Sequence, residues 1–161
     1  MLAKLRSLAV LGIDAFEIGI EADISEMLPG LTIVGLPDGA VRESRERVMS
    51  AIKNCGFQFP NRKITINMAP ADMKKEGSAF DLPIAIGLLM ASSQIEIDEP
   101  DRFIMVGELS LDGTVKPIKG VLSMAIKARE LGCGGLIVPK ENALEASVAK
   151  GMNVIPVSSL S

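Results

Sequence analysis

Alternation of apolar and polar residues is the feature that most limits what this 161-residue chain can fold into. In residues 15–24 (AFEIGIEADI), apolar side chains recur at every second position with acidic ones between them, and residues 63–69 (KITINMA) repeat the pattern. A period of two is typical of strands with one buried face. We therefore expect two strands in residues 2–24, meeting at residues 12–14, and a third strand at 63–69.

Further strands and helices follow in turn along the chain. Pairs of strands followed by single helices favour one α+β domain, a mixed sheet with helices mainly on one face. The other predicted strands are a short buried one at 31–35, a hairpin of FIMVGEL and TVKPI around Asp112–Gly113, GLIVP at 135–139 and NVIPV at 153–157; the predicted helices cover 37–54, 81–93, 120–131 and 141–150.

The composition excludes several kinds of chemistry. The chain has no histidine, which removes Ser-His triads, histidine general bases and histidine zinc sites. Cys55 and Cys133 lack C-x-x-C spacing and are expected to be reduced thiols. A net charge of −3 does not suit a basic nucleic-acid binder. The run LPIAIGLLMA is too short to span a bilayer, so we expect a soluble cytoplasmic protein with no membrane partner.

Charged residues offer few ligand sites. Arg42, Arg45 and Arg47 alternate with Glu43 and Glu46, which favours an ion-paired, solvent-exposed helix face. Acidic residues show no metal-ligand spacing, so neither a metal nor a cofactor is expected in this chain. The better candidate for phosphate contact is the pair Lys74 and Lys75 beside Gly77.

The segment KKEGSAFDLPIAI, residues 74–86, places a lone serine before an apolar helix. As a nucleophile, Ser78 would need a lysine of lowered pKa, because no histidine exists. As a structural residue it would lie in the turn, with Asp81 as the helix N-cap, because Pro83 then falls in the first turn. The sequence favours the structural role.

Three stretches closely resemble the start of the ComM/YifB family of bacterial magnesium-chelatase-like AAA+ ATPases. They are residues 11–57, which include GLPDGAVRESRERV, residues 67–89, which include KKEGSAFDLPIA, and residues 107–121, GELSLDGTVKPIKGV. The resemblance implies that residues 1–161 are a single N-terminal domain with a Lon-protease-like fold, similar to domain 2 of a ribosomal protein. The ATPase module, with its ATP and Mg, would lie outside this chain, and VSSLS is expected to continue beyond Ser161.

The resemblance also implies a function. The family is associated with hexameric rings that move along DNA and extend branch migration during competence. For this domain it implies a homo-oligomeric, ring-building role, with DNA as a possible second partner. The candidate contact for DNA or a protein partner is the rim segment, defined as Lys74, Lys75, Glu76, Gly77 and Ser78.

Lon proteases carry their nucleophile in D-G-P-S-A-G and their lysine in P-I-G-G-L-K. Laid on residues 76–81, the nucleophile position falls on Ala79, and laid on residues 117–122, the lysine position falls on Leu122. The resemblance therefore implies a domain without catalysis. The alternative is a Ser-Lys peptidase with a shifted register that uses Ser78 and Lys119.

Overall fold

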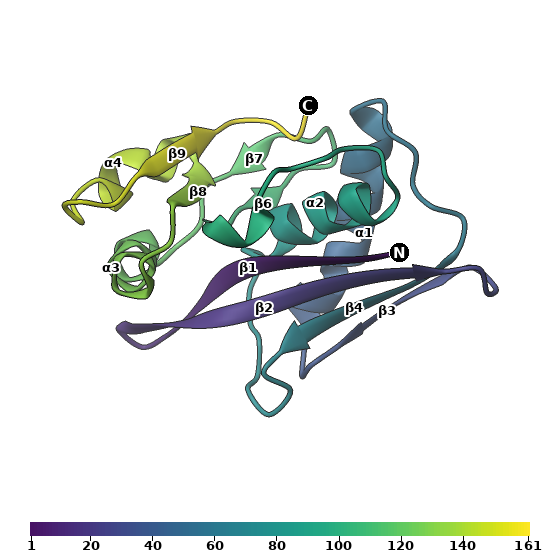
Figure 1. Ribbon diagram of the computed structural model, residues 1–161, viewed down its shortest axis with the longest axis horizontal. Helices are drawn as coiled ribbons and strands as arrows, with labels where there is room; N and C mark the ends of the chain where they lie inside the picture. Colours follow the sequence, from purple (N-terminus) through teal and green to yellow (C-terminus); the bar gives the residue numbers. More distant parts are fainter.

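A seven-stranded mixed sheet forms the centre of the computed structural model, which describes residues 1–161 (Figure 1). The strand order is β3-β4-β2-β1-β5-β8-β9. Only β2 is antiparallel to its neighbours, and every other adjacent pair is parallel. The strands are β1 (Leu2–Leu11), β2 (Asp14–Ser25), β3 (Gly30–Val34), β4 (Lys63–Ala69), β5 (Phe103–Met105), β8 (Gly135–Pro139) and β9 (Val154–Val157).

The hairpin of β1 and β2 confirms the prediction from alternation. The two strands pair from Leu2 opposite Asp23 to Leu11 opposite Asp14, which leaves Gly12 and Ile13 as a two-residue turn. Gly12 has a φ of +66°, which glycine adopts without strain. Alternate side chains of β2, from Ile18 to Ile24, are buried beneath one face of the sheet.

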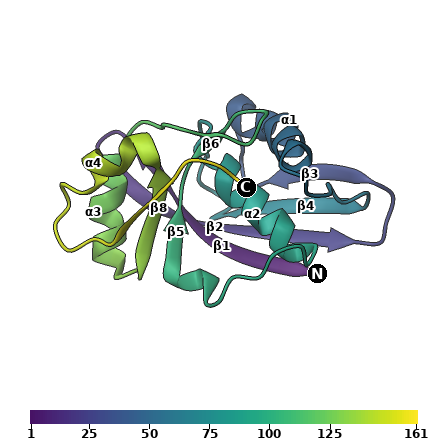
Figure 2. The same ribbon diagram turned by 90° about the horizontal axis from the view of Figure 1, so that it is seen from above.

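Helices cover both faces of the sheet, which corrects the expectation of helices mainly on one face (Figure 2). Adjacent residues of a strand point to opposite faces, and Met105 and Ile104 of β5 enter two different cores. One core packs against α1 and α2, and the other against α3 and α4. The helices are α1 (Gly39–Asn54), α2 (Asp81–Ala91), α3 (Val121–Leu131) and α4 (Ala143–Ala146), with 3-10 turns η1 (Pro100–Arg102) and η2 (Lys140–Asn142).

Two strand predictions need correction. The segment FIM is β5 of the main sheet, and the hairpin around Asp112–Gly113 consists only of β6 (Glu108–Leu109) and β7 (Val115–Lys116). The strand predicted as buried at 31–35 is β3, an edge strand whose residues alternate between half-buried and exposed. An edge strand has only one neighbour, so its apolar residues bury less area than those of a central strand.

Helix boundaries follow local signals. Asp38 caps α1 by accepting a hydrogen bond from the Val41 amide at 2.7 Å, and α3 ends at Gly132, whose φ is +69°. Helix α2 is apolar on all sides, and nearly all of its residues are buried. None of the helices has the length and apolar character needed to cross a membrane.

Candidate functional site at the N-terminus of α2

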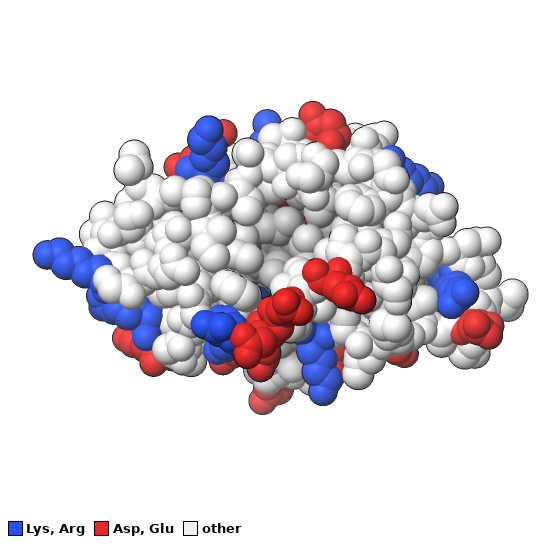
Figure 3. Space-filling view, turned by 45° about the horizontal axis from the view of Figure 1, so that its top comes forward, with Lys and Arg blue, Asp and Glu red and all other residues white.

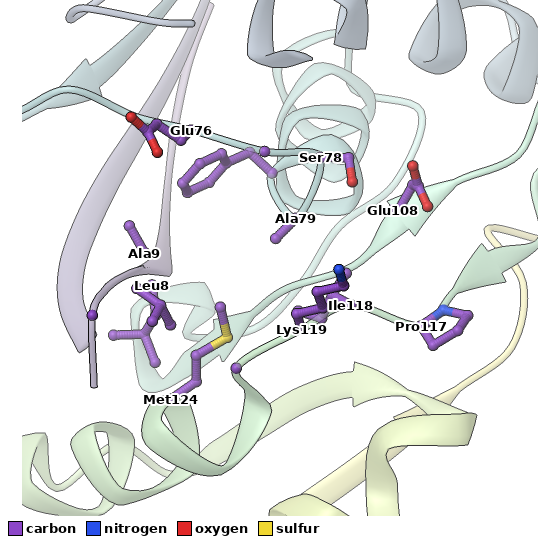
Figure 4. A pocket seen from close by; sticks show the side chains of 15 residues that line it. Leu8, Ala9, Glu76, Ser78, Ala79, Glu108, Pro117, Ile118, Lys119 and Met124 are labelled. Carbon is purple, nitrogen blue, oxygen red and sulfur yellow. The ribbon is translucent and has the colours of Figure 1, made fainter. Parts of the chain in front are cut away.

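A cavity of about 550 Å³ lies where α2 begins (Figure 4). Its walls come from four parts of the chain: the end of β1 with the turn after it, the segment before α2, β6, and the connection from β7 into α3 with the first turns of that helix. The polar side chains that line it are those of Glu76, Ser78, Glu108 and Lys119. This arrangement brings together the two predicted motifs, although about 40 residues of sequence separate them.

The rim segment is fixed to the residues just before α1 by hydrogen bonds of the backbone and of Asp38. The Asp38 carboxylate, besides capping α1, accepts the Gly77 amide at 3.2 Å, and the Asp38 amide donates to the Lys75 carbonyl at 2.9 Å. The Lys75 amide in turn donates to the Leu36 carbonyl. Gly77, with a φ of +85°, is therefore held in place by specific partners.

Lys75 is buried, which contradicts its prediction as a contact for DNA or a partner. Its side chain is 0% exposed, and its ammonium group donates to the carbonyl oxygens of Gly35, at 2.6 Å, and Pro70. Burial lowers the pKa of Lys75, although the carboxylate of Asp72 acts in the opposite direction. Sequence patterns do not reveal this burial, because both carbonyls belong to segments that meet Lys75 only in the folded chain.

The rest of the rim segment is accessible but not strongly cationic. Lys74 is exposed, and its amine lies 3.5 Å from the Glu76 carboxylate. Glu76, Gly77 and Ser78 line the cavity. On the face seen in Figure 3, most of the surface is uncharged, and acidic and basic side chains lie beside one another. That face presents no patch of positive charge alone.

The two positions that correspond to the Lon dyad have different surroundings. Ala79 lines the cavity and points toward its middle (Figure 4). Leu122 lies in the first turn of α3, is 37% exposed and does not line the cavity. Ser78 and Lys119 do line it, but no hydrogen bond joins their side chains, and Lys119 is exposed. The cavity therefore holds a hydroxyl and an amine that are not paired for catalysis.

Asp81 is not the cap of α2, which corrects the prediction. It is the first residue of the helix, and its carboxylate is fully buried and turned toward α1. It accepts hydrogen bonds from the Ser44 hydroxyl at 2.5 Å, from Arg47 Nε at 2.6 Å and Nη2 at 3.0 Å, and from the Leu109 amide at 3.1 Å. Asp81 thus joins α1, α2 and β6 beneath the cavity.

Arg47 is the residue of this network that sequence reasoning missed. The spacing of Glu43 and Arg47 predicts an i,i+4 ion pair, which forms at 3.6 Å, but the closer partner of Arg47 is Asp81. The hydrogen bond to Asp81 raises the pKa of Arg47, since it favours the charged guanidinium. The predicted ion-paired face is wrong for its two other arginines, because Arg42 and Arg45 form no ion pair.

No group of three or more acidic or cysteine side chains is placed to hold a metal ion. Cys55 and Cys133 are half-buried free thiols. Burial raises the pKa of Cys133.

Known proteins resemble this chain over most of its length. The family described as "Subunit ChlI of Mg-chelatase" matches residues 20–142. Uncharacterized protein YifB of Escherichia coli (strain K12) is 48% identical over 143 residues, which cover 89% of this chain and 28% of the relative. Competence protein ComM of Haemophilus influenzae is 44% identical over 152 residues, which cover 94% of this chain and 30% of the relative.

A more distant similarity links the chain to a protease. Lon protease 2 of Bacillus subtilis is 33% identical over 99 residues, which cover 62% of this chain and 17% of that protein. The chain spans less than a third of the length of each of these relatives. By the family match and the two closer relatives, the chain belongs to the Mg-chelatase ChlI family and corresponds to the N-terminal region of the YifB and ComM proteins, with a distant relationship to Lon protease.

Proposed function

We propose that this chain is a non-catalytic module of a ComM/YifB-type, magnesium-chelatase-like AAA+ ATPase, and that it serves the assembly of a homo-oligomeric ring. The observation that carries the absence of catalysis is the cavity at α2. The positions of the Lon dyad hold Ala79 and Leu122, so a hydroxyl and an amine are both missing where the related protease has them.

The assembly role is supported by the family and by what the cavity lacks. A module that has the protease-like fold but lacks the dyad can offer a folded surface for contacts with neighbouring subunits, although it lacks the groups for proteolysis. One relative is named a competence protein, and the resemblance of the sequence to that family implies a hexameric, DNA-translocating ATPase. Closed rings arise when each subunit presents the same two complementary surfaces to its neighbours.

A Ser-Lys peptidase with a shifted register is the second candidate, because Ser78 and Lys119 line the same cavity. Such a mechanism needs the lysine amine to take the proton of the serine hydroxyl, which requires a direct contact and an amine in a desolvated setting. The pair forms no hydrogen bond, Lys119 is exposed, and the Glu108 carboxylate shares the cavity. These three features favour the non-catalytic role.

A serine-reactive fluorophosphonate probe separates the two candidates. We expect no more labelling of the unmodified chain than of Ser78→Ala, because the hydroxyl has no base. Labelling that is present in the unmodified chain and absent in both Ser78→Ala and Lys119→Ala would establish the peptidase instead.

Sedimentation velocity tests the assembly role directly. We expect the weight-average sedimentation coefficient to rise with protein concentration, because a module that builds a ring should associate with itself. A chain that stays monomeric at the highest accessible concentration would contradict assembly by this module alone.

Guidance of DNA by the rim segment now depends on Lys74, because Lys75 is buried. Fluorescence anisotropy with labelled single-stranded and forked DNA, at low and near-physiological salt, measures it. Salt-sensitive binding that Lys74→Glu abolishes would add DNA guidance to the proposed function. Absence of binding at both salt concentrations would leave assembly as the role of this module.

A further inference from the structure

The outer edge of β3 is open for pairing. β3 lies at one end of the sheet and pairs only with β4. The Gly30 amide donates to the Arg62 carbonyl on the β4 side, so the alternate residues Leu31 and Ile33 direct their backbone N–H and C=O groups away from β4. No other element of the structure forms a hydrogen bond with these groups.

The two edges of the sheet differ in how they resist pairing. β9, at the other end, contains Pro156, which has no backbone N–H to donate. β3 has the sequence GLTIV, with no proline and no charged residue. Natural proteins usually block open edges with such residues. An unblocked edge of five residues therefore indicates a place where another strand can bind.

A groove with a cationic border runs beside this edge, between β3 and α1. It consists of two adjoining hollows of about 410 and 390 Å³, which share Leu31 and Arg45. Neither hollow is lined by an acidic residue. The apolar lining comes from Pro29, Leu31, Ile33, Met49, Phe59 and Pro60, and the cationic lining from Arg42, Arg45, Lys53 and Arg62.

Three of these four cations are free of partners. Arg42, Arg45 and Lys53 form neither an ion pair nor a side-chain hydrogen bond, and Arg62 lies 3.9 Å from the exposed Glu26 carboxylate. Arg47 on the same helix, in contrast, binds the buried Asp81. The arginines that face the groove are thus available for a ligand.

Charge and backbone chemistry together select the kind of ligand. A second copy that paired its own β3 with this edge would bring two cationic borders together, and like charges would oppose the contact. A nucleic-acid backbone matches the charge but has no alternating N–H and C=O groups for Leu31 and Ile33. An extended peptide has these groups, and acidic side chains on it would meet the four cations.

We infer that this groove binds an extended acidic segment of a partner protein, which adds a strand to β3. Backbone bonds to Leu31 and Ile33 hold the segment, and its alternate side chains point into the groove. The carboxylates of these side chains contact Arg42, Arg45, Lys53 and Arg62, and their aliphatic carbons pack against the apolar lining. This site is separate from the cavity at α2 and does not depend on ring assembly or on catalysis.

Fluorescence anisotropy with a labelled eight-residue peptide of alternating Glu and Val tests the inference. Three matched probes accompany it: the same peptide with alternate backbone amides N-methylated, a peptide of alternating Lys and Val, and an eight-nucleotide oligo-dT. Arg42→Glu/Arg45→Glu reverses two cations of the groove. Lys140→Glu/Lys150→Glu makes the same change of charge at exposed lysines on the other half of the molecule. Circular dichroism confirms that both variants fold.

We expect the Glu-Val peptide to bind the unmodified chain and the Lys140→Glu/Lys150→Glu variant alike. Its affinity should fall about tenfold or more in Arg42→Glu/Arg45→Glu, since two attractive contacts become repulsive. The N-methylated and Lys-Val peptides should bind at least about tenfold more weakly, since each lacks one part of the recognition. Absence of binding by the Glu-Val peptide would overturn the inference. Oligo-dT or the N-methylated peptide binding as tightly would also overturn it, because charge alone would then explain the groove.

Discussion

Replacing Asp81 by asparagine should destabilise the whole domain. The Asp81 carboxylate is fully buried and receives hydrogen bonds from Ser44, Arg47 and the Leu109 amide. An asparagine side chain has one acceptor oxygen, and its NH₂ group would face one of these donors. Asp81→Asn therefore removes the charge that balances Arg47 and leaves at least one buried donor without an acceptor.

The loss of stability depends on which hydrogen bonds and ion pairs Asp81 or Arg47 keeps after its partner is replaced. Breaking a buried ion pair costs about 3–5 kcal/mol. Asp81→Asn should lie near the lower limit, because Arg47 keeps the Ala40 carbonyl at 2.9 Å and Glu43 at 3.6 Å, and part of its side chain meets solvent. Arg47→Met should lie near the upper limit, because the Asp81 carboxylate is fully buried and pairs with no other cation. At this chain length, such losses lower Tm by about 6–20 °C.

Urea unfolding followed by circular dichroism measures these differences, and the double variant tests their common origin. Since both substitutions break the same pair, Asp81→Asn/Arg47→Met should cost less than the sum of the single changes by more than about 1 kcal/mol. Glu43→Gln is the control and should change stability by less than about 0.5 kcal/mol, because Glu43 is exposed. Additive single effects, or losses below about 1 kcal/mol, would refute a buried network at this position.

Three other predictions concern the packing and titration of single residues. Gly113→Ala should lower the free energy of unfolding by about 2 kcal/mol, measured by calorimetry, because φ is +90° and a Cβ would overlap the Cys55 sulfur. Adding Cys55→Ala should restore part of this stability by removing the overlap, while the backbone strain remains. Burial lowers the pKa of Lys75 in the folded state, so the unfolded state binds more protons at pH values between that lowered pKa and 10.5. The free energy of unfolding, relative to that of Lys75→Met, should therefore rise with pH in this window. Urea midpoints of the two proteins that stay parallel from about pH 7 to about pH 10 would contradict this. Burial also raises the pKa of Cys133, so iodoacetamide should alkylate it more slowly in the folded chain than in urea at about pH 8, whereas equal rates would disprove its protection.

Local patterns were enough to predict the elements that depend on nearby residues. The alternation in β2 and β4 predicted both strands, since each has one face buried beneath α1 and α2. The helix predicted at 120–131 corresponds to α3, which ends before the glycine at 132. The resemblance to Lon protease also pointed to the right two segments, because the GSA turn and the PIKG segment line the same cavity.

Features that depend on distant residues could not be predicted in this way. Lys75 looked like a surface cation because its partners, Gly35 and Pro70, are brought to it only by the fold. Asp81 looked like a cap because its true partner, Arg47, lies 34 residues away. The position of β3 at the edge was hidden for the same reason, because an apolar run does not reveal how many neighbours a strand has.

The central position of β1 has a consequence for the way the chain must be made. β1 is synthesised before the other strands of this sheet, yet it binds β2 on one side and β5, through Arg6 opposite Ile104, on the other. The hydroxyl of Ser7, buried at the centre of β1, donates to the Met105 carbonyl, so this hydrogen bond cannot form until Met105 has been synthesised. During synthesis, the β1–β2 hairpin can form early while its other edge stays open, and an open apolar edge promotes aggregation. A nascent chain halted before residue 103 should therefore need a chaperone, although most of its own secondary structure is already complete.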